Sequence, residues 1–211
     1  MSIDVFTGVP GSGKSLHAAR MVRYALDRKY PRPVIANFPL AKDAPVMHPE
    51  CHNYVPNEEM SAGRIIDFAD GYWTDHPSDF REDYILMVID EAQLLFNSRR
   101  WSDRSRMSYL EFLSQSRKYG VHVVLVAQSA KMIDNQFRML IEREFNHRRV
   151  KAMGPLGAMV ALPFGGRLFM VVRTYYVNGQ SSERLGMDMM TASRRDMAMY
   201  DSYNRFERQG N

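Results

Sequence analysis

Residues 8–15 read Gly8-Val9-Pro10-Gly11-Ser12-Gly13-Lys14-Ser15, the G-x-x-x-x-G-K-[ST] pattern of a phosphate-binding P-loop. A strand-like run, Ile3 to Thr7, precedes them, and a helix-like segment, Leu16 to Leu26, follows. The glycines allow a tight turn in which successive N–H groups and the helix N-terminus point at an anion. This context disfavours the alternative of a glycine turn that only caps a helix. The pattern therefore predicts a site for a nucleoside triphosphate.

Two side chains of the pattern predict specific contacts with the nucleotide. Lys14 would reach the β- and γ-phosphates and act in catalysis, and the Ser15 hydroxyl would ligate Mg²⁺. The remaining residues would contact the phosphates mainly through backbone amides. The expected nucleotide-binding residues are Gly8, Val9, Pro10, Gly11, Ser12, Gly13, Lys14, Ser15 and Leu16.

The size and composition of the chain are those of a small soluble protein. Its 211 residues, 45% of them hydrophobic and 25% charged, fit one α/β domain with a small appendage. The single cysteine, Cys51, cannot form an intrachain disulfide, which indicates a reducing compartment. His48 and His52 lie near it, but no second group of ligands completes a zinc site. The first strand-like run begins within three residues of the start, so we expect no signal peptide before it.

Charge and apolar content are unevenly distributed. The formal net charge of +4 mildly favours a polyanionic partner, and arginines gather at 99–106 and 138–151. The longest apolar stretch, Met153 to Gly166, is interrupted by glycine and proline and is too short for a membrane span. We interpret it as a buried or interface-forming hairpin. The 16 methionines fit either core packing or a subunit contact.

Unbroken apolar runs predict strands of a parallel sheet, because both faces of such strands are buried. Residues 84–89 and 121–127 have this character, and Asn178-Gly179 favours a hairpin turn. The expected strands are 3–7, 33–38, 84–89, 121–127 and 169–177, and the expected helices are 16–26, 61–72, 107–119, 136–143 and 193–206.

This alternation predicts an α/β fold, a three-layer P-loop NTPase sandwich with a mostly parallel central sheet. We expect residues 1–151 to form the NTPase core. Residues 152–211 would add β-hairpin elements and a terminal helix that pack on the core within a single domain.

Two carboxylates follow the apolar run at 84–89. Asp90 is expected at the carboxyl end of its strand, where α/β sheets bind ligands, and would hold Mg²⁺ directly or through water. Glu91 points elsewhere because strand residues alternate, and it is placed to polarise the water that attacks the γ-phosphate. The alternative is an acidic pair that stabilises a helix N-terminus. The P-loop earlier in the chain favours the catalytic interpretation.

Further polar candidates come from the next strand and from the arginines. Gln128 ends the strand at 121–127, where it would bond the γ-phosphate or the attacking water; a loop residue bonded to backbone is the alternative. Arg117, Arg138 and Arg148 are candidates for a cation supplied across a subunit interface to the transition state. For each of them a solvated or ion-paired surface role is the competing interpretation.

Several pieces of the chain together resemble the zonula-occludens-toxin-like family, which includes the assembly ATPases of filamentous phages. The P-loop and Asp90-Glu91 pieces are generic, whereas Asn37-Phe38-Pro39 and the pieces within 117–128 are more specific. The likeness spans most of the chain. Its pieces are residues 5–15, 35–40, 88–93, 116–120, 125–129, 133–134 and 199–203.

The resemblance implies membership of the FtsK–HerA group of P-loop motors, which form hexameric rings and move DNA. It implies ATP as the nucleotide, and Lys14 and Ser15 as nucleotide and metal contacts. It also implies that Asp90 organises the metal, that Glu91 is catalytic and that Gln128 is the sensor. Arg117 would lie at the subunit interface.

The resemblance leaves two functions open. The first is an ATP-hydrolysing motor of phage assembly that extrudes or packages viral DNA, with other copies of the chain, viral DNA and phage assembly proteins at the inner membrane as partners. The second is a nucleotide-dependent assembly switch that binds proteins without gripping DNA. A small-molecule kinase has less support because no acceptor-binding signature is present.

Phage relatives usually continue into a membrane span, which this chain does not show. We expect it in the cytoplasm of a bacterial host, with membrane association through a partner or a further C-terminal part as an open alternative.

Overall fold

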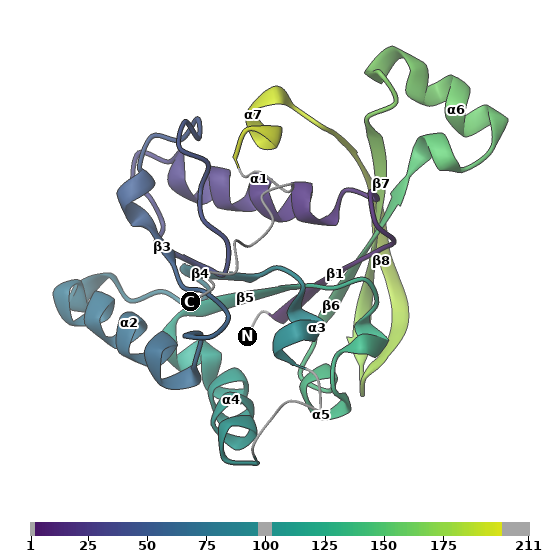
Figure 1. Ribbon diagram of the computed structural model, residues 1–211. Coiled ribbons are helices and arrows are strands. Elements are labelled where there is room, and N and C mark those ends of the chain that lie inside the picture. Colours follow the sequence, from purple (N-terminus) through teal and green to yellow (C-terminus); the bar gives the residue numbers. More distant parts are fainter. Residues whose placement is uncertain (1–2, 97–102, 200–211) are drawn as a thin grey trace, which may run out of the picture.

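A computed structural model describes residues 3–96 and 103–199 of the chain, and residues 1–2, 97–102 and 200–211 lie outside its described part. The described strands form one eight-stranded sheet in the order β3-β2-β4-β5-β1-β6-β7-β8 (Figure 1). Their bounds are β1 Ile3–Thr7, β2 Val34–Ala36, β3 His52–Tyr54, β4 Ile85–Ile89, β5 Val121–Val126, β6 Arg143–Arg149, β7 Leu168–Val177 and β8 Gln180–Thr191.

Neighbouring strands from β3 to β6 run parallel, and only β7 and β8 pair antiparallel with their neighbours. The mostly parallel α/β sheet predicted from the sequence is therefore confirmed. The β7–β8 hairpin turns at Asn178 and Gly179, whose φ angles of 51° and 73° are the positive values that a tight hairpin turn requires.

Helices cover both faces of the parallel part of the sheet (Figure 1). α1 lies on one face, and α2 and α4 lie on the other. The helices are α1 Lys14–Leu26, α2 Ala62–Asp75, α3 Ala92–Leu95, α4 Asp103–Gln115, α5 Asn135–Arg138, α6 Pro155–Ala161 and α7 Arg194–Met197. Single turns of 3₁₀ helix lie at Pro49–Cys51, Pro77–Asp79, Ser116–Tyr119, Ala130–Met132, Val150–Ala152 and Leu162–Phe164.

Successive residues of the buried strands enter two different cores. In β4, Met87 packs in the core beneath α2 and α4, and Leu86 and Val88 pack in the core beneath α1. This arrangement explains why the strand reads as an unbroken apolar run, since neither of its faces meets water. Burial on both faces places β4 in the middle of the molecule. Its carboxyl end lies with the carboxyl end of β1, where the P-loop begins.

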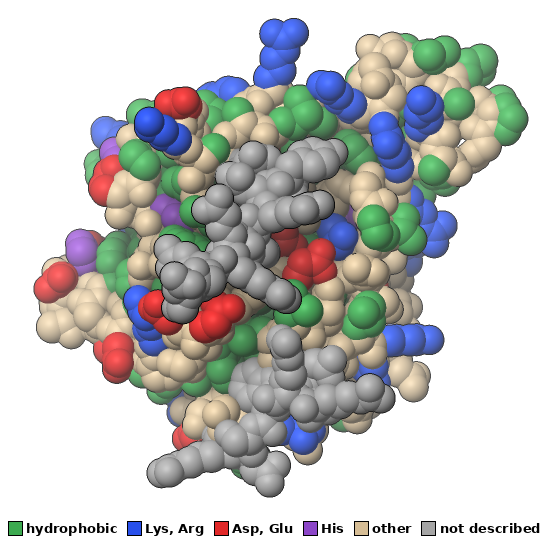
Figure 2. Space-filling view, in the orientation of Figure 1, with side chains coloured by type: hydrophobic (Ala, Val, Ile, Leu, Met, Phe, Trp, Pro, Cys, Tyr) green, Lys and Arg blue, Asp and Glu red, His purple; other side chains and the backbone are tan. Residues whose placement is uncertain are grey.

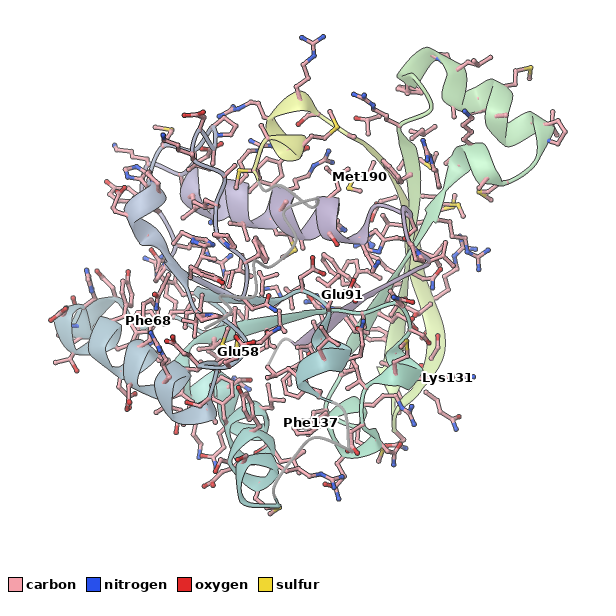
Figure 3. All side chains as sticks on the ribbon, viewed as in Figure 1. Glu58, Phe68, Glu91, Lys131, Phe137 and Met190 are labelled. Atoms are coloured by element: carbon pink, nitrogen blue, oxygen red, sulfur yellow. The ribbon has the colours of Figure 1, made fainter. Side chains whose placement is uncertain are left out.

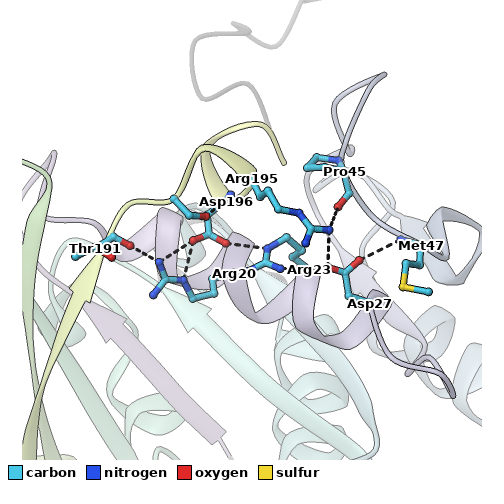
Figure 4. A network of polar contacts seen from close by, with 9 residues as sticks. Arg20, Arg23, Asp27, Pro45, Met47, Thr191, Arg195 and Asp196 are labelled. Carbon is cyan, nitrogen blue, oxygen red and sulfur yellow. Dashed lines mark hydrogen bonds and ion pairs between the residues drawn. The ribbon is translucent and has the colours of Figure 1, made fainter. Parts of the chain in front are cut away.

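The short helix α7 is tied to α1 by a network of charged side chains (Figure 4). The Asp196 carboxylate accepts hydrogen bonds from Arg23 Nε at 2.9 Å and from Arg20 Nε at 2.8 Å. Burial raises the pKa of Asp196, but hydrogen bonds from Ser193, Arg20 and Arg23 outweigh that effect and lower it. Asp196 is therefore charged at neutral pH and holds α7 against the helix that follows the P-loop.

The structure corrects three expectations about individual elements. The helix expected at 136–143 ends at Arg138, and Arg143 begins β6 instead. The apolar stretch at 153–166 is not a hairpin and is mostly exposed: it forms α6 and a 3₁₀ turn that protrude between β6 and β7 (Figure 1). The short strand β3 was not expected. Of the helix expected at 193–206, only α7 lies within the described residues.

Candidate nucleotide-binding and catalytic site

The P-loop connects β1 to α1 and follows a path that depends on glycine. Gly8, Gly11 and Gly13 have φ angles of 146°, 75° and 96°. A Cβ at Gly8 would lie 2.5 Å from the carbonyl oxygen of His147, so no larger residue fits there. The Gly8 N–H donates to the carbonyl oxygen of Gln128 at 3.2 Å, which ties the start of the loop to the end of β5.

The first turn of α1 has the features of an anion site. Gly13 caps the helix without a side-chain hydrogen bond, so the first amides of α1 are open to a ligand. Lys14 is 6% exposed, and within the described part of the chain its ammonium group has no hydrogen-bond or ion-pair partner. Ser12 Oγ is buried and likewise lacks a partner among the described residues. A bound phosphate would supply partners for these groups.

The other residues of the predicted P-loop set divide into two kinds. Val9, Pro10 and Gly11 are exposed at the outer turn of the loop. The Leu16 side chain instead packs against a small core that includes Phe169 and belongs to the β7–β8 hairpin. Leu16 can therefore reach a phosphate only through its backbone amide.

Ser15 and Asp90 lie side by side at the point where the sequence predicts the metal. The Ser15 hydroxyl lies 3.4 Å from Asp90 Oδ1, and Asp90 follows β4 directly. One hydroxyl and one carboxylate fit a Mg²⁺ ion that takes its other ligands from phosphates and water. Among the described residues no cluster of three or more His, Cys, Asp or Glu could hold a metal ion.

Asn37 holds the backbone of Asp90 from the neighbouring strand. The Asp90 N–H donates to Asn37 Oδ1 at 2.7 Å, and Asn37 Nδ2 donates to the Asp90 carbonyl oxygen at 2.8 Å. Asn37 Nδ2 also donates to Asn57 Oδ1 at 2.9 Å, and the residue is 2% exposed. Asn37 follows β2, which pairs with β4, so this side chain sets where Asp90 and Glu91 leave the sheet.

Glu91 has a backbone conformation that is uncommon for a residue other than glycine. Its φ of 50° lies in the left-handed region, which non-glycine residues enter only at a free-energy cost. The Glu91 N–H donates to Asp90 Oδ1 at 2.9 Å, and Gln93 Nε2 donates to the Glu91 carboxylate. Figure 3 shows Glu91 near α3, in the middle of the molecule. Gln93 thus orients the carboxylate that the sequence analysis assigns to catalysis.

Gln128 lies beyond the end of β5, between the ends of β1 and β4 in the order of the sheet. Its side chain is exposed, and its backbone carbonyl bonds the P-loop as described above. This position agrees with a contact to a bound nucleotide. The alternative interpretation, a loop residue bonded to backbone, also fits the bond from Gly8 to its carbonyl oxygen, so both interpretations of Gln128 stay open.

The three candidate arginines lie in different places. Arg117 precedes β5, so it lies at the amino-terminal ends of the parallel strands, whereas the P-loop lies at their carboxyl-terminal ends. Its Nε lies 2.5 Å from Glu82 Oε1. Arg148 lies near the carboxyl end of β6, which runs parallel to β1, so it is on the same side of the sheet's strand ends as the P-loop. Arg138 lies in α5 and bonds Asn135 at 2.7 Å. The structure does not bring Arg117 to the nucleotide site of its own chain.

Two neutral histidines support the last residue of β1. His147 Nδ1 lies 3.1 Å from the Thr7 carbonyl oxygen, and its Nε2 lies 2.9 Å from His17 Nδ1. Burial is the main cause that lowers the pKa of His147 to about 3, and the nearby His17 lowers it further. Burial likewise lowers the pKa of His17 to about 4. A neutral His147 can donate to Thr7 and accept from His17, which fixes the approach to the P-loop.

Sequence reasoning did not assign roles to Asn37, Gln93 or His147. Asn37 and Gln93 lay within pieces quoted for the family resemblance, which was the one available signal for them. Nothing in the sequence near His147 indicates its contact with Thr7, because β6 and β1 are far apart in the chain and adjacent only in the sheet.

Comparisons of sequence agree with the resemblance. Residues 2–164 match the family model described as Zonular occludens toxin (Zot). The Gene 1 protein of Enterobacteria phage I2-2 is 35% identical over 86 residues, which are 39% of this chain and 24% of that protein. The Gene 1 protein of Escherichia phage If1 is 28% identical over 134 residues, 57% of this chain and 36% of that protein. The chain thus spans a minor part of the length of these relatives.

Solved structures show the same fold. The N-terminal domain of zonular occludens toxin from Neisseria meningitidis matches with a TM-score of 0.58 and 17% identity, over 95% of this chain and 98% of that one. B204, the DNA-packaging ATPase of Sulfolobus Turreted Icosahedral Virus, matches with a TM-score of 0.53 and 13% identity, over 91% and 98%. At these identities the likeness shows a shared architecture, that of P-loop NTPases.

Proposed function

Because the chain belongs to the Zonular occludens toxin (Zot) family, we propose that it is an ATP-hydrolysing motor of phage assembly that extrudes or packages viral DNA. One observation carries the proposal: the Ser15 hydroxyl lies 3.4 Å from Asp90 Oδ1. Lys14, which has no partner among the described residues, precedes Ser15, and Glu91, with its φ of 50°, follows Asp90. These are the groups that phosphoryl transfer to water requires, gathered at the carboxyl-terminal ends of β1 and β4.

Each side chain of the site has a distinct task in this proposal. The amides of α1 and Lys14 bind the β- and γ-phosphates and offset their negative charge. Ser15 and Asp90 would hold Mg²⁺, which supplies charge neutralisation at the phosphates when bound. Glu91 would accept a proton from the attacking water, and Gln93 keeps its carboxylate in place. Gln128 would sense the γ-phosphate.

The arginine contribution is proposed to come from a neighbouring subunit. Arg117 lies at the amino-terminal ends of the parallel strands, and the P-loop of its own chain lies at the carboxyl-terminal ends. Arg117 can therefore reach a nucleotide only across a subunit interface. A ring of identical subunits, six by analogy with the family, would provide such an interface. Arg148 is the alternative candidate for this cation, since it lies near the carboxyl end of β6, on the side of the strand ends where the P-loop lies.

Viral DNA, other copies of the chain and phage assembly proteins at the host inner membrane are the proposed partners. The net charge of +4 favours a polyanion, and the name of B204 records DNA packaging for a protein of the same fold. Among the described residues no helix is long and apolar enough to cross a bilayer. We propose that the described part of the chain acts on the cytoplasmic side of the host membrane.

Turnover of ATP by the purified chain, alone and with single- or double-stranded DNA, tests the proposal. Lys14→Ala serves as the blank, and Lys131→Ala serves as its matched control, since Lys131 is an exposed lysine on another segment (Figure 3). Turnover that requires Lys14 and rises several-fold with DNA supports the motor. Turnover that requires Lys14 but ignores DNA supports the nucleotide-dependent assembly switch instead. Turnover that survives Lys14→Ala rejects the site.

A further inference from the structure

The protrusion formed by residues 150–166, between β6 and β7, exposes an apolar surface that the nucleotide site does not use (Figure 1). Leu156 and Leu162 at its surface are 74% and 72% exposed. Further large apolar side chains share this exposure. They are Met153, Met159, Val160 and Phe164. A contiguous patch of this kind marks an interaction site, because isolated proteins rarely leave one open to water.

The fold holds this apolar surface outward as an ordered unit. Val150, Ala161 and Leu168 form a small core at its base. A Cβ at Gly157 would lie 2.3 Å from the Val150 carbonyl oxygen, so α6 packs closely on the preceding turn. The protrusion therefore already has a packed core of its own. Its exposed leucines and methionines lie outside that core, on the surface.

The chemistry of the protrusion is unlike that of an ordinary protein interface. Residues 152–166 contain no charged, hydroxyl or amide side chain. Protein interfaces also carry directional hydrogen bonds across the contact, about one per 100–200 Å² of interface. A surface made only of aliphatic, aromatic and thioether groups instead fits a disordered apolar environment.

A positive collar surrounds the base of the protrusion. Arg148, Arg149, Lys151 and Arg167 are exposed at its two ends, and within the described part of the chain none of them makes an ion pair. The sequence from Phe145 to Ser182 contains no aspartate or glutamate. Figure 2 shows apolar side chains on this lobe and basic side chains beside its neck. The charge of the collar is complementary to a negatively charged surface.

We propose that the protrusion inserts its apolar tip among the headgroups and upper acyl chains of an anionic phospholipid membrane, with the four basic residues of the collar on the phosphates. Apolar groups at the tip and Lys/Arg around them are the combination that interfacial membrane binding uses. The inserted part is seven helical residues and one further turn, which lies in the interface and does not span the bilayer. This proposal is independent of nucleotide hydrolysis.

Co-sedimentation with vesicles tests the proposal. We expect the full chain to bind vesicles that contain phosphatidylglycerol at least about tenfold better than pure phosphatidylcholine vesicles, with a loss of binding in high salt. Leu156→Glu combined with Leu162→Glu should reduce binding by about tenfold or more. The matched control is Met47→Glu, which replaces a 65% exposed methionine on another loop and should bind as the parent protein does.

A fluorescent reporter distinguishes insertion from surface attraction. Leu162→Trp should shift its emission to the blue with anionic vesicles and be quenched by brominated acyl chains. Equal vesicle binding by the Leu156→Glu/Leu162→Glu protein would overturn the proposal. So would the absence of vesicle binding together with an oligomer that these two substitutions dissociate, since a second copy of the chain would then be what covers the tip. Because both leucines are highly exposed, the substitutions should leave the thermal unfolding midpoint unchanged.

Discussion

Two hydrogen bonds join Asn37 and Asp90: the Asp90 N–H donates to Asn37 Oδ1 at 2.7 Å, and Asn37 Nδ2 donates to the Asp90 carbonyl oxygen at 2.8 Å. They lie 53 residues apart in the chain and join the ends of two paired strands. The contact matters because Asp90 carries the proposed metal-binding carboxylate and Glu91 the proposed general base. The side-chain amide of Asn37, directly after β2, therefore positions the backbone from which both carboxylates extend.

We expect Asn37→Ala to lower the turnover number more than it weakens ATP binding. The substitution leaves the Asp90 N–H and carbonyl oxygen without these partners, which costs about 1–3 kcal/mol of folding free energy. It also frees the backbone at Glu91, so turnover should fall about tenfold to a hundredfold. Steady-state kinetics and equilibrium nucleotide binding check the split. Asn57→Ala, which removes only one acceptor of Asn37, is the matched control. An Asn37→Ala protein with normal turnover would contradict the positioning role.

Glu91→Gln should bind ATP and hydrolyse it about a hundredfold to ten-thousandfold more slowly, because the amide cannot accept a proton from water. Single-turnover hydrolysis and nucleotide binding measure the two effects separately. Glu58→Gln removes an exposed carboxylate from another loop (Figure 3) and should leave both unchanged. A rate for Glu91→Gln near that of the parent protein would place the general base elsewhere.

Stability should fall as the pH drops below about 6.5, the pKa of an unperturbed histidine. His147 has a pKa of about 3 in the folded chain, so between pH 6.5 and 3 the unfolded chain binds the proton more readily. This one group should remove about 2 kcal/mol from the free energy of unfolding at pH 5. Denaturant unfolding at pH 7 and pH 5 checks the prediction. His147→Asn should lose less stability between the two pH values than the parent protein does, whereas a substitution of the exposed His76 should leave the difference unchanged.

Arg117→Ala should reduce turnover only under conditions in which subunits assemble. Within one chain Arg117 pairs with Glu82 at the amino-terminal ends of the parallel strands, away from the P-loop. A catalytic effect of Arg117 therefore requires a neighbouring subunit. Turnover per subunit measured against protein concentration should rise for the parent protein and stay low for the variant, with nucleotide binding intact. The adjacent Lys118→Ala is the control. Full activity of Arg117→Ala at high concentration would exclude it and direct attention to Arg148.

The parts of the fold that could be predicted from the sequence are those whose signal is local. The P-loop is contiguous, and β4 reads as buried on both faces because each of its residues enters a core. β3 gave no such signal, since His52–Tyr54 is short, polar and at the edge of the sheet. The stretch at 153–166 was wrongly expected to form a hairpin, because apolar composition alone does not distinguish a buried segment from an exposed helical one.

The same distinction applies to the site. The sequence predicts roles for Ser15, Asp90 and Glu91 because Ser15 belongs to the P-loop pattern and Asp90 and Glu91 directly follow a buried strand. The contacts of Asn37 with Asp90 and of His147 with Thr7 depend on β2 lying beside β4 and on β6 lying beside β1. Sequence order does not reveal these neighbours, so the supporting residues emerge only from the sheet topology.

The tie between α1 and α7 gives the P-loop helix a direct connection to the end of the β7–β8 hairpin. α1 begins at Lys14, the proposed phosphate-binding lysine, and bonds Asp196 through Arg20 and Arg23 further along the same helix. Arg20 also bonds the Thr191 carbonyl oxygen at the end of β8. If α1 moves when the proposed γ-phosphate contact is lost, the movement would therefore act directly on the β7–β8 hairpin. Force generated at one end of a 13-residue helix would reach an outer edge of the sheet without passing through its core.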